Sequence, residues 1–158
     1  MDNKMVILFE EIQKLHAKYE SSLHITPDFY DPGNMEYLDK YFGSYNENTG
    51  EILLRFEVKG TRYEGRTELI ESVNIGDKIQ VVRDEDNEYN SNNFTFLTLK
   101  NRNLGHMPAE LCNAIAPLYD EGDFVLEKSV VSYVEPISKR SRYAKQAILF
   151  VEITGRLI

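Results

Sequence analysis

The chain has 158 residues, of which 42% are hydrophobic and 28% are charged. This length suits one core and is short for two ordinary domains, and the composition excludes a largely disordered chain. The net charge of −8 argues against a broad basic surface of the kind that binds generic duplex DNA.

The negative charge is concentrated near the start of the chain. Residues 1–57 hold 11 acidic and 5 basic side chains (net −6), whereas residues 58–158 hold 15 acidic and 13 basic ones (net −2). Any nucleic-acid binding is therefore expected at a local site that reads a particular shape.

The first 23 residues predict an amphipathic helix. Apolar side chains recur there at steps of three and four, with charged residues between them. The apolar positions are Met5, Leu8, Ile12, Leu15, Tyr19 and Leu23. The unbroken apolar run, Met5–Phe9, is too short for a signal peptide or a membrane span, so we expect a cytoplasmic protein without membrane contact.

The rest of the chain is rich in strands. Turn-forming residues occupy 26–33, and a short helix is expected around 35–42. Six segments rich in β-branched and aromatic residues then predict strands at 51–60, 78–84, 93–100, 103–107, 124–135 and 144–155. One helix interrupts them at 107–118, where Pro108 suits the first turn and Pro117 is expected to end it.

These elements predict a mainly β, α+β fold. Closure of six strands into a small OB-like or SH3-like barrel removes exposed edges, and an open sandwich is the alternative. We expect residues 1–50 to form a helical extension with turns and residues 51–158 to form the barrel domain. The N-terminal helix would cover one end of the barrel or pair with a second copy.

Three short segments are unusually polar or aromatic for a strand-rich chain. They are "GTRYEG" (60–65), "RDEDNEYNSNN" (83–93) and "LGHMPAE" (104–110). Taken in this order, they resemble the HIRAN domain, a module found fused to DNA-repair translocases and also as a free-standing bacterial protein. The resemblance covers about residues 52–135.

The resemblance implies a surface groove that binds single-stranded DNA, with preference for the free 3′ hydroxyl end. By position, Arg62 would meet a phosphate, and Tyr63 would stack on or line the terminal nucleotides. Asn87 would bond to the DNA backbone, and Tyr89 would stack on the last base. Asn90 stands where the family usually has an aspartate facing the terminal hydroxyl. His106 would lie at the groove edge, as a further implied contact.

The same residues also have ordinary structural interpretations. Tyrosine forms strands readily, so Tyr63 and Tyr89 could fill the barrel core or plug loops, and Arg62 could simply face solvent. His106 beside a glycine could be a hydrogen-bonded surface histidine. The basic stretch "ISKRSRYAKQ" (137–146) is either a solvated hairpin tip or a flap that extends the groove.

No catalytic or cofactor motif is recognisable in the sequence. The histidines at 16, 24 and 106 have no metal-ligand spacing, and the acidic run at 84–88 lacks the glycine and glutamate that a calcium-binding loop needs. The single cysteine, Cys112, lies in an apolar stretch and is expected to pack in the core. We therefore predict a protein without enzymatic activity, metal or cofactor.

The predicted function is recognition of a single-stranded DNA 3′ end, with RNA left open as the ligand. The alternative is a protein-interaction or oligomerisation module in which the acidic N-terminal helix makes the contact, and a homo-oligomer is one form of it.

Overall fold

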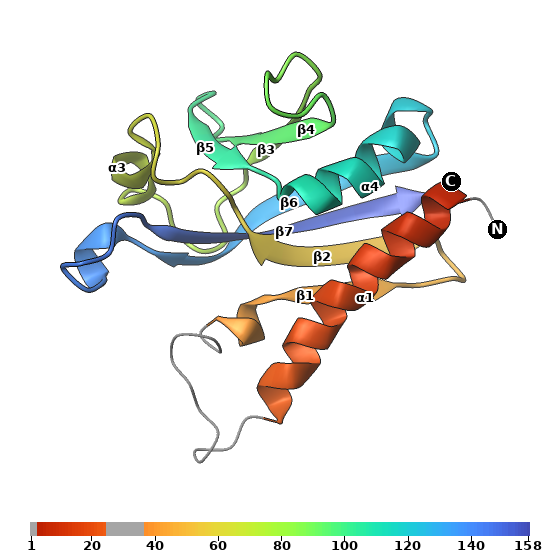
Figure 1. The fold of residues 1–158 in the computed structure, drawn as a ribbon, viewed down its shortest axis with the longest axis horizontal. Helices are drawn as coiled ribbons and strands as arrows, with labels where there is room; N and C mark the ends of the chain where they lie inside the picture. The colour runs from red at the N-terminus through yellow and green to blue at the C-terminus, as the bar shows by residue number, and fades with distance from the viewer. Residues whose placement is uncertain (1–2, 25–36) are drawn as a thin grey trace.

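The computed structural model of the protein describes residues 3–24 and 37–158. Figure 1 shows how the helices and strands within them are arranged. In chain order the elements are α1 (Asn3–Leu23), the 3-10 helix η2 (Leu38–Lys40), β1 (Phe42–Tyr45), β2 (Glu51–Glu57), α3 (Arg66–Ile70), β3 (Gln80–Asp84), β4 (Asn93–Leu97), β5 (Asn103–His106), α4 (Ala109–Asp120), β6 (Phe124–Glu135), the 3-10 helix η3 (Ile137–Lys139) and β7 (Ile148–Leu157). No helix in the described ranges is long and apolar enough to cross a membrane.

The strands form two antiparallel sheets with the core between them. The larger sheet has the order β1-β2-β7-β6 and the smaller has the order β3-β4-β5. Strand β2 alternates between buried and less buried residues, so Ile52, Leu54 and Phe56 all point into the core. The ring of Phe56 meets that of Phe96 from the smaller sheet at a centroid distance of 5.8 Å, which joins the two sheets through side chains.

Closure of the strands into a barrel is not confirmed. Between the two sheets, the described residues form only two isolated bridges, one joining Lys59 to His106 and the other joining Lys78 to Val130. The strands therefore follow the order of a ring, but at the two places where the sheets meet, neighbouring segments are joined by one bridged residue pair each. After the Lys59–His106 pair the chain leaves the sheet, because Gly60 has a φ of +78° and begins a turn. The mainly β, α+β class is confirmed.

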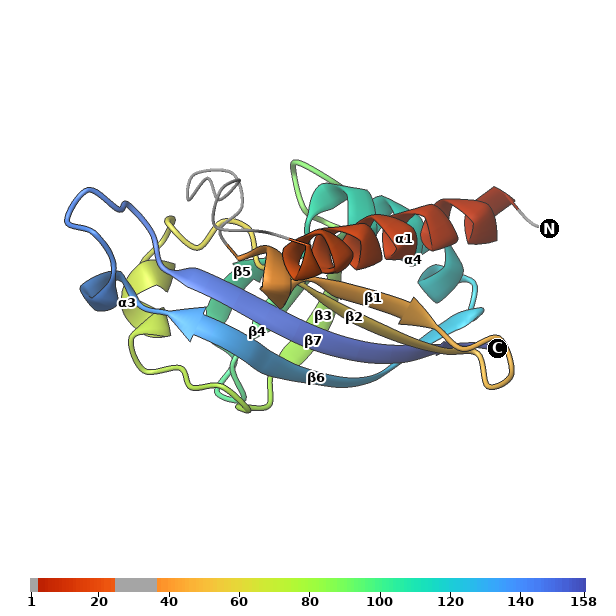
Figure 2. The ribbon, with the colours of Figure 1, turned by 90° about the horizontal axis from the view of Figure 1, so that it is seen from below.

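Helix α1 lies along β1 and beside α4 in both views of the fold (Figures 1 and 2). Leu8, Ile12 and Leu15 from the predicted apolar stripe are buried there, whereas Leu23 is 63% exposed. The close approach needs Gly43 on β1, since a Cβ atom at this position would overlap the carbonyl oxygen of Ile12. The buried part of the apolar stripe thus packs against other elements of the same chain.

Helix α4 starts where Pro108 predicts but does not end at Pro117. Pro117 lies inside the helix, which continues to Asp120. A proline there removes one backbone hydrogen bond to Asn113, on the exposed side of the helix. Burial of Leu118 in the same turn offsets that loss. Cys112 is fully buried, as expected, and burial raises the pKa of its thiol to about 11.

Sequence patterns did not predict β1, α3 or the short 3-10 helix η3. Strand β1 extends the larger sheet from within the N-terminal extension, where the turn-rich composition hid it. Helix α3 has only five residues, too few for a helical period to be visible. The short helix expected at 35–42 is reduced to η2, and residues 35–36 lie outside the described ranges.

Candidate nucleic-acid interface

The first loop, residues 58–65, is anchored from below and presents its tip to solvent. Thr61 Oγ1 donates to the carbonyl of Ala147 at 2.9 Å, and Arg66 Nη1 donates to the carbonyl of Gly60 at 3.0 Å. Tyr63, between these anchors, is 56% exposed. The guanidinium of Arg62 lies 5.2 Å from the centre of the Tyr63 ring, so a cation and an aromatic face are offered together.

The second loop, residues 85–92, is shaped by the side chain of Asn87. Its Oδ1 accepts hydrogen bonds from the backbone nitrogens of Tyr89 and Asn90, both at 3.0 Å, and its Nδ2 donates to Asp84 at 3.3 Å. These bonds hold the turn that displays Tyr89, which is 89% exposed. Asn87 therefore acts first on the loop itself, a role that the sequence interpretation did not include.

Arg83 and Asn90 fasten this second loop to α4. Arg83 makes a two-pronged ion pair with Asp120, with N–O distances of 3.0 and 2.9 Å, and Nη1 also donates to the carbonyl of Ser91. Asn90 Nδ2 donates to Asn113 Oδ1 at 3.1 Å. The position of the loop relative to α4 is thus fixed by charged and amide groups.

His106 lies at the end of β5, partly buried. Its Nδ1 is 3.0 Å from Asn93 Nδ2 and 3.0 Å from Thr95 Oγ1. Because the amide nitrogen donates, Nδ1 accepts and the ring proton is placed on Nε2. Burial, followed by the positive charge of Arg66, lowers the pKa of His106 below its ordinary value, so the ring is neutral at neutral pH.

The loops converge around His106. Lys59 and His106 exchange two backbone hydrogen bonds of 2.8 Å, which brings the start of the first loop against β5. The close approach needs Gly105, where a Cβ atom would lie 2.5 Å from the carbonyl oxygen of Lys59. The second loop reaches the same place through Asn93 at its end, whose Nδ2 lies 3.0 Å from His106 Nδ1. The pKa of Tyr89 is raised, mainly by its hydrogen bond to Glu88 and the charge of that carboxylate.

The two tyrosines stand on an open surface, contrary to the closed slot that end recognition suggests. Their exposure leaves both rings accessible from solvent, and a bound strand would have to complete the enclosure itself. The surroundings also include Glu64, Asp84 and Glu88, which reduces the positive potential that Arg62 can provide. Stacking is therefore the stronger source of affinity that this surface offers.

Comparison with known families decides the identity of the domain. The family model described as the HIRAN domain matches residues 52–150. The chain belongs to the HIRAN domain family. HIRAN domains are nucleic-acid-binding modules, so the general role follows from membership.

Two solved structures resemble this HIRAN protein. One is a protein from Lactobacillus plantarum, at 19% identity over 66% of this chain and 98% of that chain, with a TM-score of 0.48. The other is the HIRAN domain of human HLTF, at 23% identity over 68% of this chain and 81% of that chain, with a TM-score of 0.47. A search of curated proteins found no match.

The HIRAN match leaves α1, η2 and β1 outside its range. Strand β1 nevertheless pairs with β2 along its whole length, from Phe42 opposite Arg55 to Tyr45 opposite Ile52. The extension is therefore continuous with the larger sheet. The boundary at residues 50 and 51 stays a prediction.

Arg66 is the main site residue that the sequence interpretation missed. It is only 6% exposed, and it reaches both Gly60 and Glu64, so it supports the loop that carries Tyr63. The sequence contains two arginines around the glycine at 65. Left-handed backbone at Glu64 and Gly65, with φ of +54° and +77°, turns the chain between exposed Arg62 and buried Arg66.

The basic hairpin at 137–146 lies beside α3 (Figures 1 and 2). Ser138 donates to the Glu71 carboxylate from both its backbone nitrogen and its hydroxyl, at 3.0 and 2.8 Å. Tyr143 at its tip is 76% exposed. Both interpretations of the hairpin, as a solvated tip or as a flap that extends the groove, stay predictions. Within residues 3–24 and 37–158, no cluster of histidine, cysteine and acidic residues suited to a metal is found.

Proposed function

We infer that this HIRAN domain binds the free 3′ end of single-stranded DNA and acts as a binding module without catalysis. The observation that carries the proposal is the pair of exposed tyrosines, Tyr63 and Tyr89, on two loop tips that adjoin His106. Such an arrangement suits a strand whose bases are free to stack, because every base offers a π-face to a phenol ring.

The polar groups beside the tyrosines have the chemistry that a strand terminus needs. Arg62 offers a forked donor for a phosphate, and neutral His106 offers Nε2–H as a donor. Asn90 can both donate to and accept from a hydroxyl, although without the charge that an aspartate would supply. A preference for the 3′ hydroxyl is therefore expected to be modest.

The proposal is tested by titrating the purified protein with fluorescent oligonucleotides that end in a 3′ hydroxyl or a 3′ phosphate. The hydroxyl form should bind more tightly, and an RNA strand of the same sequence resolves the choice of nucleic acid. Equal binding of both ends would remove end recognition, and no binding of any strand would remove the function.

Tyr89 provides the matched pair of variants. Tyr89→Ala should weaken binding by about 1–3 kcal/mol, the usual contribution of one base stacked on an aromatic ring. Tyr89→Phe keeps the ring and should retain most of the affinity. If both variants bind like the wild type, Tyr89 has no part in the interface.

A further inference from the structure

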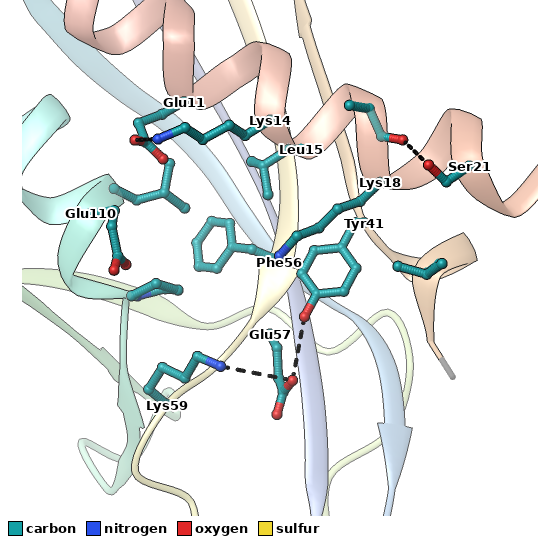
Figure 3. A pocket seen from close by; sticks show the side chains of 14 residues that line it. Glu11, Lys14, Leu15, Lys18, Ser21, Tyr41, Phe56, Glu57, Lys59 and Glu110 are labelled. Carbon is teal, nitrogen blue, oxygen red and sulfur yellow. Dashed lines mark hydrogen bonds and ion pairs between the residues drawn. The ribbon is translucent and has the colours of Figure 1, made fainter. Parts of the chain in front are cut away.

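A pocket of about 640 Å³ lies between the N-terminal extension and the HIRAN domain (Figure 3). We call it the α1 pocket. It is floored by apolar side chains and rimmed by cationic and aromatic ones: Leu15, Phe56 and Leu111 on the floor, and Lys18, Tyr41 and Lys59 on the rim. Its volume is in the range of pockets that hold small organic ligands or single nucleotides.

Two cations reach into this pocket from opposite sides. Lys18 comes from α1 and Lys59 from the chain just after β2, and Figure 3 shows both ammonium groups directed inward. Lys18 Nζ lies 4.2 Å from the centre of the Tyr41 ring. Among the residues that the structure describes, no carboxylate lies within ion-pair distance of Lys18, and its ammonium faces the Tyr41 ring.

The acidic groups around the pocket are mostly engaged. Glu11 is paired with Lys14, with the ammonium 2.9 Å from its carboxylate. Glu57 accepts from the Tyr41 hydroxyl at 3.5 Å and lies 3.9 Å from Lys59. Burial and Glu57 together raise the pKa of Tyr41 to about 12, so the phenol stays protonated and continues to donate. Glu110 is exposed at the far rim.

The α1 pocket shares lining residues with the segments next to His106. Lys59, on its rim, is the residue whose backbone pairs with His106. Pro108, two residues after His106, forms part of the pocket wall. Lys59 and Pro108 therefore link the lining of the pocket to the segment that carries His106.

We propose that the α1 pocket receives a nucleotide of the bound strand that lies 5′ of the terminal nucleotides, with its base on the apolar floor and its phosphate at Lys18. The inference rests on the proposed function and extends it, because it makes the N-terminal extension part of the nucleic-acid interface.

The test uses 3′-hydroxyl oligonucleotides of increasing length with the full chain. Lys18→Gln should leave the affinity for a trinucleotide unchanged and weaken binding of a dodecanucleotide by about fivefold to tenfold, since only the longer strand reaches the pocket. Lys100→Gln, which removes the same charge at the opposite end of β5 from His106, is the control and should change neither. Thermal melts of both variants show whether the fold is kept.

The outcomes separate the two proposals. If the wild type binds but Lys18→Gln matches Lys100→Gln at every length, the pocket is not part of the interface and end binding stands alone. An equal loss for short and long strands would also overturn the inference, because it would not depend on reaching the pocket. If the wild type binds no strand, both proposals fail together.

Discussion

Two arginines at the interface are expected to behave in opposite ways. Arg83 is bound to Asp120 and to two loop carbonyls, so Arg83→Ala should lower the free energy of unfolding by about 1–3 kcal/mol. Arg62 is exposed and, within the described part of the chain, lies over the Tyr63 ring without an ion pair, so Arg62→Ala should change stability by less than about 0.5 kcal/mol while weakening DNA binding. Urea denaturation and oligonucleotide titration of both variants check this, and the reverse pattern would contradict the assignment.

His106 makes stability depend on pH. Its pKa in the folded protein lies below the ordinary value of 6.5, so below that pH the unfolded chain binds more protons than the folded one. The contribution is complete above pH 6.5 and is lost as the pH falls through that value toward the folded pKa. Denaturation at pH 7.5 and 5.5 should therefore show a larger loss for the wild type than for His106→Gln. An identical loss in both would rule out this linkage.

At the residue scale, sequence reasoning found the residues that are displayed but not those that support them. Tyr63, Tyr89 and His106 stand out by type and spacing, and the structure places them on adjoining segments. The support given by Arg66 and Asn113 depends on a left-handed turn and on a contact between distant elements. Neither leaves a local pattern in the chain.

At the scale of elements, the seating of α1 on β1 depends on Gly43. Gly43→Ala would place a Cβ atom against the Ile12 carbonyl and 3.1 Å from Leu15 Cβ, and should cost about 1–3 kcal/mol of unfolding free energy. Ser44→Ala, at the exposed neighbour, is the control and should be nearly neutral. If Gly43→Ala is as stable as the control, the close packing of α1 is not required.

The same element shows where periodicity succeeds and where it stops. The three-and-four spacing in α1 predicted which face is buried, because one apolar stripe must meet one partner surface. Periodicity does not say what that partner is. The partner proved to be β1 and α4 of the same chain, and self-association through α1 remains an untested alternative.

For the whole molecule, the negative net charge predicts a weak dependence of binding on salt. The proposed contacts at Arg62 and Lys18 would amount to about one or two phosphates, so log K should fall with log salt concentration at a slope of about −0.7 to −1.4. Titrations at several salt concentrations measure this slope. A slope steeper than about −4 would mean that a broad basic surface is used instead.

The overall architecture was predicted in outline from the six strand-like segments, all of which form strands. Closure was not predictable, because it depends on how two strands diverge after the single pair of Lys59 with His106, where Gly60 begins a turn. Sequence patterns describe each strand separately, whereas the pairing between the edges of the two sheets depends on how the strands twist relative to one another.

The most direct test of the interface is an amide chemical-shift map, recorded while a short 3′-hydroxyl oligonucleotide is added to the isotopically labelled protein. The largest shifts are expected in three segments together, 60–65, 86–91 and 105–108. Shifts confined to other surfaces, or to only one of these segments, would contradict a site built where they meet.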